Sequence, residues 1–256
     1  MNKITKPGDV SSSGLSLNKG KLRSSTTPFQ QRVNQAKQSE VDPATLPNRI
    51  CLMLDKSSSM SHIERAGDSR IDLLKKALQN FIARCDFTNT AIAIETFPES
   101  FELALTNSQL MLSTAGFMFE ADGNTPMRHC VEAALGKVPM TRGVIVSDGE
   151  ATDWRFHDDR AGMEVWLDEK LGTHPDELLA KYKEAGIPID CVHISTDSGG
   201  EALLRKIAET TGGLFIKFTD VSAFAQAFGY LAPGFRAMLT DGRVSASELG
   251  AREVSK

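Results

Sequence analysis

Between positions 49 and 231 the chain alternates short apolar runs with amphipathic stretches of helical period. Apolar runs of this length are typical of strands that are buried on both faces of a sheet. They predict six strands, at 49–54, 91–97, 101–105, 143–148, 187–194 and 214–218. Only Pro98-Glu99-Ser100 separates the second strand from the third, so these two are expected to form an antiparallel hairpin at the sheet edge.

The amphipathic stretches between these runs predict the helices. Apolar residues recur at helical spacing over 69–85, 175–185, 201–211 and 221–231, and more weakly near 109–119. Asp68 is expected to cap the first helix, and Thr125 to cap another whose first residue is Pro126. Strands that alternate with helices of this length predict an α/β fold. It is expected to be doubly wound and Rossmann-like, with a mostly parallel six-stranded sheet and helices on both faces.

Composition divides the chain into a domain and two tails. Residues 1–45 are rich in Ser, Thr, Lys, Gln and Asn, with few apolar positions, which predicts a disordered leader. This leader is basic, with seven Lys and Arg against three Asp and Glu, whereas the rest has 22 against 30. The domain is expected over 46–231, with a surface insertion at 150–174. Residues 232–256 are expected to form a polar C-terminal tail with weak helical potential.

The composition also argues against several classes of function. The acidic body lacks the basic stripe with which proteins bind nucleic acid. No apolar run is long enough to span a membrane, and no secretory signal opens the chain, so we expect a cytoplasmic protein. The four cysteines lie far apart and the five histidines show no paired spacing, which disfavours zinc.

A set of oxygen-bearing side chains follows the predicted strands. Asp55, Ser57 and Ser59 occupy alternate positions just after the first strand, and Asp148 ends the fourth. Thr125 adds another hydroxyl at the start of a helix. Carboxylate and hydroxyl oxygens suit hard cations such as Mg²⁺, Mn²⁺ or Ca²⁺. The carboxyl ends of strands are also where open α/β sheets bind ligands, so these residues predict one metal site.

The three segments that carry these residues are D-x-S-x-S at 55–59, G-N-T-P at 123–126 and S-D-G at 147–149. Together they resemble the metal-ion-dependent adhesion site of von Willebrand factor A (vWA) domains, of the intracellular bacterial or phage type. The resemblance covers about residues 48–231 and implies the strand order 3-2-1-4-5-6. It implies direct metal contacts from Ser57, Ser59 and Thr125, with Asp55 and Asp148 acting partly through water.

Two positions depart from the family pattern. Ser58 stands where the family often has Gly, which can restrict the loop backbone. Lys56 places a cation near the metal, and its side chain is expected to point into solvent. Neither change removes a ligand.

The resemblance implies a non-enzymatic, metal-dependent protein-binding module. A divalent cation held largely by neutral hydroxyls attracts the carboxylate of a partner's Asp or Glu. Cytoplasmic vWA proteins often act beside AAA+ ATPases of the MoxR or chelatase type, or in stress and phage-conflict systems. A MoxR-type ATPase is therefore the favoured partner for an adaptor of this kind. Trp154 and Trp166 in the insertion are candidate partner contacts, because Trp is enriched in interface hot spots, although rings that only anchor the loop are an equal alternative.

Two alternatives remain open. A Mg²⁺-dependent phosphatase or other hydrolase would also place Asp55 after a first strand. Such a phosphatase needs a second aspartate two residues later, where this chain has Ser57. The chain could also be a scaffold that has lost metal binding, which a metal titration would decide.

Overall fold

A computed structural model of the protein describes residues 41–255, except for 65–66, 99–100, 150, 155–172, 196–199 and 219–220. These residues belong to one compact unit, Val41–Lys256. Its strands are β1 (Asn48–Asp55), β2 (Thr90–Phe97), β3 (Glu102–Thr106), β4 (Arg142–Ser147), β5 (Ile189–His193), β6 (Phe215–Phe218) and β7 (Ala251–Ser255). Its α-helices are α2 (Arg70–Arg84), α3 (Gln109–Ala115), α4 (Met127–Lys137), α6 (Pro175–Glu184), α7 (Glu201–Thr211), α8 (Val221–Ala227) and α9 (Pro233–Thr240). Short 3₁₀ helices lie at Pro43–Thr45, Ser58–Ser61, Gly116–Met118 and Phe228–Leu231.

The strands form one sheet in the order β3-β2-β1-β4-β5-β6-β7. The five strands from β2 to β6 run parallel to one another, whereas β3 and β7 pair antiparallel at the two edges. The first six strands therefore follow the order that the sequence resemblance implied. The expected edge hairpin of β2 and β3 is also confirmed.

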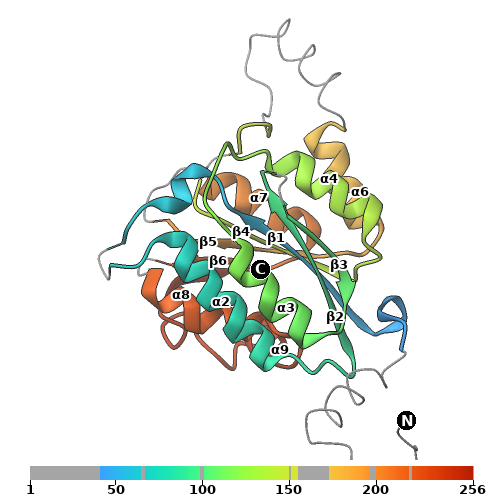
Figure 1. Cartoon of the computed structure of the whole chain (residues 1–256). Coiled ribbons are helices and arrows are strands. Elements are labelled where there is room, and N and C mark those ends of the chain that lie inside the picture. The colour runs from blue at the N-terminus through green and yellow to red at the C-terminus, as the bar shows by residue number, and fades with distance from the viewer. Residues whose placement is uncertain are drawn as a thin grey trace, which may run out of the picture. The chain divides into compact units, whose positions relative to one another are not determined.

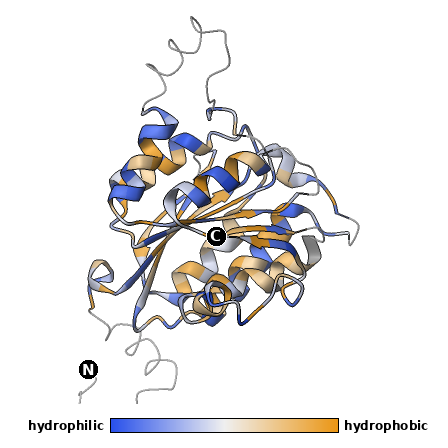
Figure 2. Ribbon diagram, turned by 180° about the vertical axis from the view of Figure 1, so that it is seen from behind, coloured by the Kyte–Doolittle hydropathy of each residue, from blue (hydrophilic) through white to orange (hydrophobic). Residues whose placement is uncertain are grey.

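Helices cover both faces of this sheet (Figure 1). On one face lie α2, α3, α8 and α9, and on the other lie α4, α6 and α7. Strand β1 contributes to both cores, because Leu52 and Leu54 point to the first face while Cys51 and Met53 point to the second. Apolar residues gather along the strands and on the inward sides of the helices (Figure 2). This two-faced burial explains why the central strands read as continuous apolar runs.

The C-terminal tail differs from the expectation. The segment 232–256, expected to be a polar tail with weak helical potential, contains helix α9 and also a seventh strand, β7, which pairs with β6 from Phe215↔Ser255 to Phe218↔Ala251. The sheet is therefore mixed and seven-stranded, not six-stranded. The expected leader is also too long at its end, because Pro43–Thr45 already forms a 3₁₀ helix with Asp42 as its N-cap.

Two predicted helix caps are wrong. The N-cap of α2 is Ser69 rather than Asp68, and its hydroxyl accepts a hydrogen bond from the backbone N–H of Asp72. Pro126, not Thr125, occupies the N-cap position of α4, and its side chain cannot accept a hydrogen bond.

The predicted end of α7 is confirmed. Gly212 caps the helix in the left-handed conformation, with φ of 76°. Gly213 then passes so close to β5 that a Cβ atom there would lie 1.9 Å from the carbonyl oxygen of Ile189. Both glycines are therefore needed for the turn into β6.

None of the described helices is long and apolar enough to cross a membrane.

Candidate metal centre

Four of the five predicted metal ligands meet at the carboxyl ends of β1 and β4. Asp55 ends β1, and the register of the two strands, Leu54↔Val146, places it next to Ser147 at the end of β4. Ser57 and Ser59 follow in the loop after β1, and Asp148 follows Ser147. Adjacent parallel strands thus bring residues 93 positions apart in sequence into one cluster.

A chain of hydrogen bonds joins these side chains. The hydroxyl oxygens of Ser57 and Ser59 lie 3.0 Å apart, and the Ser59 hydroxyl donates to Asp148 Oδ1 at 2.8 Å. Asp55 accepts from the backbone N–H of Ser57 at 2.8 Å and from the Ser147 hydroxyl at 2.5 Å. Ser59 is exposed, so the cluster opens to solvent at this residue.

Asp55 is fully buried. Burial raises the pKa of its carboxyl to about 6, and the nearby charge of Asp148 also raises it, against the hydrogen bonds from Ser147 and Ser57. Burial without a cation therefore disfavours the charged form of this carboxyl. A divalent cation at the cluster would favour the charged form again.

Arg70, at the start of α2, is a member of the cluster that the sequence did not reveal. Its guanidinium donates to Asp148 Oδ2 at 2.5 Å and to Glu64 Oε1 at 2.6 Å. Burial opposes the charged form, but the two carboxylates raise the pKa of Arg70 overall, so it stays charged. Asp148 is thus shared, with one oxygen towards Ser59 and the other towards a fixed positive charge. Nothing in the local sequence marks Arg70, because it is brought here by the packing of α2 against the sheet.

The loop of Thr125 lies beside the loop after β1. The backbone N–H and the hydroxyl of Ser58 both donate to the carbonyl of Gly123, at 3.0 and 2.9 Å. Thr125 is buried, but no hydrogen bond within the described residues joins its hydroxyl to the other four ligands. Lys56 is also buried and does not point into solvent as expected, because its ammonium donates to the Glu120 carbonyl at 3.2 Å.

The donor set fits a hard divalent cation. Hydroxyl and carboxylate oxygens face one another, and the hydrogen atoms that now bridge Ser57, Ser59 and Asp148 occupy positions that a cation would replace. In the described ranges no three His, Cys, Asp or Glu side chains gather as a metal-ligand group. Binding here would therefore depend on the hydroxyl oxygens as well as on two carboxylates.

The described ends of the predicted insertion are attached to α4. Asp153 caps this helix, since its carboxylate accepts from the backbone N–H groups of Arg128 and His129, at 3.0 and 2.9 Å. The backbone N–H of Thr152 donates to the Thr125 carbonyl at 2.9 Å. At the other end, the backbone N–H and the hydroxyl of Thr173 donate to the Glu132 carboxylate. The Thr173 carbonyl accepts from the Arg128 guanidinium. The insertion therefore leaves the sheet next to the Thr125 loop, on the side of the cluster.

Of the two tryptophans expected as candidate partner contacts, only Trp154 lies within the described residues. Trp154 is only 5% exposed and packs in the core between the sheet and helices α4, α6 and α7. Its ring is therefore part of the domain interior, as in the alternative that it anchors the loop. Trp166 lies outside the described residues.

No family model and no curated protein matches this sequence. Solved structures do match the fold. The pilus adhesin SpaC from Lactobacillus rhamnosus GG is 13% identical, covering 74% of this chain and 30% of the adhesin, with a TM-score of 0.55. BatB from Bacteroides thetaiotaomicron is 13% identical over 71% of this chain and 95% of BatB, with a TM-score of 0.50. The SpRpn10 VWA domain is 14% identical over 64% of this chain and 82% of that domain, with a TM-score of 0.48. At such identity the likeness to SpaC and BatB establishes the fold alone.

Proposed function

We propose that this chain, whose fold is that of von Willebrand factor A domains, is a non-enzymatic protein-binding module that depends on one divalent cation. Asp55, Ser57, Ser59, Thr125 and Asp148 would hold Mg²⁺, or else Mn²⁺ or Ca²⁺. When bound, the ion supplies an open coordination position for a carboxylate of the partner. The observation that carries this proposal is the hydrogen-bonded chain from Ser57 through Ser59 to Asp148, which opens to solvent at Ser59.

The same geometry supports binding more than hydrolysis. Asp55, the residue that a phosphatase would use, is fully buried, and its two oxygens accept hydrogen bonds from Ser57 and Ser147. A nucleophile or general base needs an oxygen within reach of the substrate. A module that presents a cation needs only the open side at Ser59.

Calorimetric titration of the full chain with MgCl₂ and MnCl₂ tests the metal site. Ser59→Ala removes an exposed hydroxyl between Ser57 and Asp148, so the affinity is expected to fall at least about tenfold, or about 1.4 kcal/mol. Ser61→Ala is the matched control, because within the described part of the chain its hydroxyl donates only to the Ser58 carbonyl, at 2.7 Å. Equal affinities for wild type and Ser59→Ala would place any bound metal elsewhere.

The partner is proposed from the resemblance rather than from the geometry. We favour a cytoplasmic AAA+ ATPase of the MoxR type, with the chain as its adaptor or regulator, or a partner in a stress or phage-conflict system. Affinity capture with Mg²⁺, and again with a chelator, tests this idea. A partner that depends on the cation is captured only with Mg²⁺ and is lost with Ser59→Ala.

A further inference from the structure

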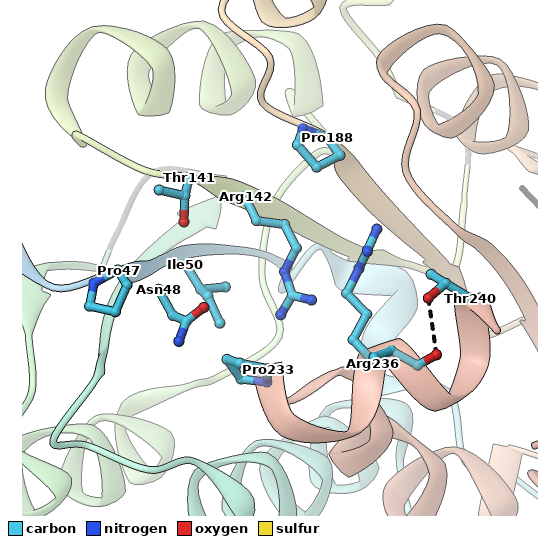
Figure 3. Close-up of a pocket in the computed structure, with 10 residues that line it drawn as sticks. Pro47, Asn48, Ile50, Thr141, Arg142, Pro188, Pro233, Arg236 and Thr240 are labelled. Atoms are coloured by element: carbon cyan, nitrogen blue, oxygen red, sulfur yellow. Dashed lines mark hydrogen bonds between the residues drawn. The ribbon is translucent and has the colours of Figure 1, made fainter. Parts of the chain in front are cut away.

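A pocket lies under α9, at the end of the parallel strands opposite the candidate metal centre (Figure 3). The starts of β1 and β4, the residue before β5 and helix α9 line an open pocket of about 400 Å³. The pocket is lined by Pro47, Asn48, Ile50, Thr141, Arg142, Pro188, Pro233, Arg236, Ala237 and Thr240. Pockets that hold small molecules commonly enclose about 300–1,000 Å³, so this volume suits one.

Two arginines of the pocket share a single carboxylate. Arg236 binds Asp190 with both arms of its guanidinium, Nε to Oδ2 and Nη2 to Oδ1, each at 2.8 Å. Asp190 is fully buried, and its Oδ1 also accepts from the backbone N–H of Leu214 at 2.8 Å. Arg142 reaches Asp190 only at 3.5 Å and donates its Nη2 to the Leu231 carbonyl at 2.5 Å.

The pocket therefore carries an excess of one positive charge. Arg142 is only 7% exposed, and the lining holds no acidic residue. Burial lowers the pKa of Arg142 to about 10, although Asp190 raises it, and the second guanidinium lowers it further. A buried charge with incomplete compensation is costly, and an anion of the right size would remove that cost. Guanidinium groups match the geometry of carboxylate and phosphate oxygens.

We propose that this pocket binds a small organic molecule through a carboxylate or phosphate group placed between Arg142 and Arg236. The rest of the lining is uncharged: the side chains of Asn48, Thr141 and Thr240 donate to backbone carbonyls beside the pocket, while Pro47, Ile50 and Pro233 supply apolar walls. In Figure 3 the two arginine side chains extend from different elements, the start of β4 and helix α9, into the same space. The site is independent of the metal cluster, which lies at the other end of the same strands.

Thermal unfolding and calorimetry of the full chain test the site with inorganic phosphate and, separately, succinate as probes. A chelator is present, and NaCl keeps the ionic strength constant, so that neither the metal cluster nor general screening contributes. Phosphate or succinate is expected to raise the melting temperature in a saturable way, with a dissociation constant near or below about 1 mM. A response to phosphate but not to succinate, or the reverse, identifies the anionic group.

Ala237→Glu is the informative variant. Ala237 lines the pocket and is exposed, so a Glu there has room, and we expect its carboxylate to pair with the two arginines. The variant is expected to have a higher melting temperature without ligand and no further response to either probe. Arg243→Gln is the control, because it changes the net charge by the same one unit at a residue outside the pocket whose side chain is 68% exposed.

Arg142→Lys provides a second test, because it keeps the positive charge but loses the planar guanidinium with its paired N–H donors. It is expected to weaken phosphate binding at least about tenfold while leaving Mg²⁺ binding unchanged. The proposal is overturned if neither probe binds wild type up to about 10 mM, or if Ala237→Glu responds as wild type does. Loss of Mg²⁺ binding with Ser59→Ala does not bear on this pocket, so the two proposals fail separately.

Discussion

Arg70 places a fixed positive charge against the carboxylate that a divalent cation would use. Its Nη1 lies 2.5 Å from Asp148 Oδ2, and Glu64 holds the same guanidinium from the other side. A divalent cation at the proposed site would share Asp148 with the guanidinium, and the two positive charges would repel each other. Arg70 would therefore weaken metal binding, and it offsets the charge of Asp148 when no metal is bound.

The first prediction concerns this competition. Arg70→Gln is expected to raise Mg²⁺ affinity by about threefold to tenfold, or about 0.7–1.4 kcal/mol, because one repulsive charge is removed. Without metal, the same variant is expected to be less stable, because Asp148 loses its positively charged partner. Calorimetry and urea unfolding with chelator measure the two effects.

Lys76→Gln is the control for this prediction. It removes one charge from the same helix, at a side chain that is 52% exposed and pairs with Asp68. A gain in Mg²⁺ affinity as large as that of Arg70→Gln would show that the effect is one of net charge alone.

At the residue scale, the sequence predicted four of the clustered side chains and missed the ones that surround them. Asp55, Ser57 and Ser59 are close in sequence, and Asp148 ends a recognisable strand, so the topology of parallel strands suffices to join them. Arg70 could not be predicted in this way. Its position depends on how α2 packs on the sheet, which is not encoded in local spacing.

At the element scale, the N-terminus of helix α4 is capped by a residue that is distant in the sequence. The first turn of a helix leaves backbone N–H groups without partners, and Pro126 cannot satisfy them. The carboxylate of Asp153 does so instead, 25 and 24 residues after the two groups that it binds. The predicted cap at Thr125 was wrong because sequence rules consider only the residue next to the helix.

Asp153→Ala is therefore expected to destabilise the domain by about 0.5–2 kcal/mol, the usual cost of losing an N-cap. Urea unfolding followed by circular dichroism measures the change. Asp153→Asn should lose less stability than the Ala variant, because its single side-chain oxygen can still accept one of the two hydrogen bonds. If the Ala variant is as stable as the Asn variant, the carboxylate does not act as a cap.

The edge strand β7 is attached through side chains as well as through the backbone. Arg205 on α7 donates to both oxygens of Glu253 on β7, at 2.6 and 2.9 Å, and to Glu201 at 2.9 Å. These hydrogen bonds with Arg205 lower the pKa of Glu253, and hydrogen bonds with Lys217 and Arg205 lower the pKa of Glu201. The seventh strand could not be predicted from the sequence, because its short run, Ala-Arg-Glu-Val-Ser, has one buried residue and no apolar alternation.

The lowered pKa values give this attachment a pH dependence. A carboxyl whose pKa is lower in the folded state stabilises the fold above its unfolded pKa, near 4.3, and loses that effect as the pH falls through the folded pKa. Arg205→Met is expected to cost about 0.5–1 kcal/mol at pH 7, since the pair is partly exposed. The difference from wild type should shrink below about pH 4.

Urea unfolding at pH 7 and at about pH 3.5 measures this difference. Arg243→Met serves as the comparison, because its pair with Asp241 is local and exposed. A cost for Arg205→Met that is the same at both pH values would mean that the arginine acts through its packing over Phe215, 4.3 Å from the ring centre, and not through the carboxylates.

At the scale of the whole domain, the parallel strands separate two sites of opposite charge. The carboxyl ends hold Asp55 and Asp148, which would bind the proposed cation, and Arg142 at the amino end of β4 and Arg236 on α9 would bind the proposed anion. The first site follows from the six strands that the sequence predicted. The second depends on α9, which belongs to the segment that was expected to be a polar tail.

The last prediction compares removal of the two ends of the chain. Leu239, Leu249 and Ala251 in the C-terminal segment are at least 92% buried against the core, and β7 covers the edge of β6. Removing residues 232–256 exposes this apolar surface and leaves Asp190 without Arg236, at an expected cost of about 3–6 kcal/mol. For a domain of this size, that lowers the melting temperature by about 10–20 °C.

Removing residues 1–40 is expected to change the melting temperature by less than about 2 °C, because their composition offers too few apolar side chains to bury. Scanning calorimetry of the two truncated proteins and of the full chain makes the comparison. If the C-terminal truncation had the same melting temperature as the full chain, α9 and β7 would add nothing to stability. A large loss on removing the N-terminal residues would instead show that this basic segment packs on the domain.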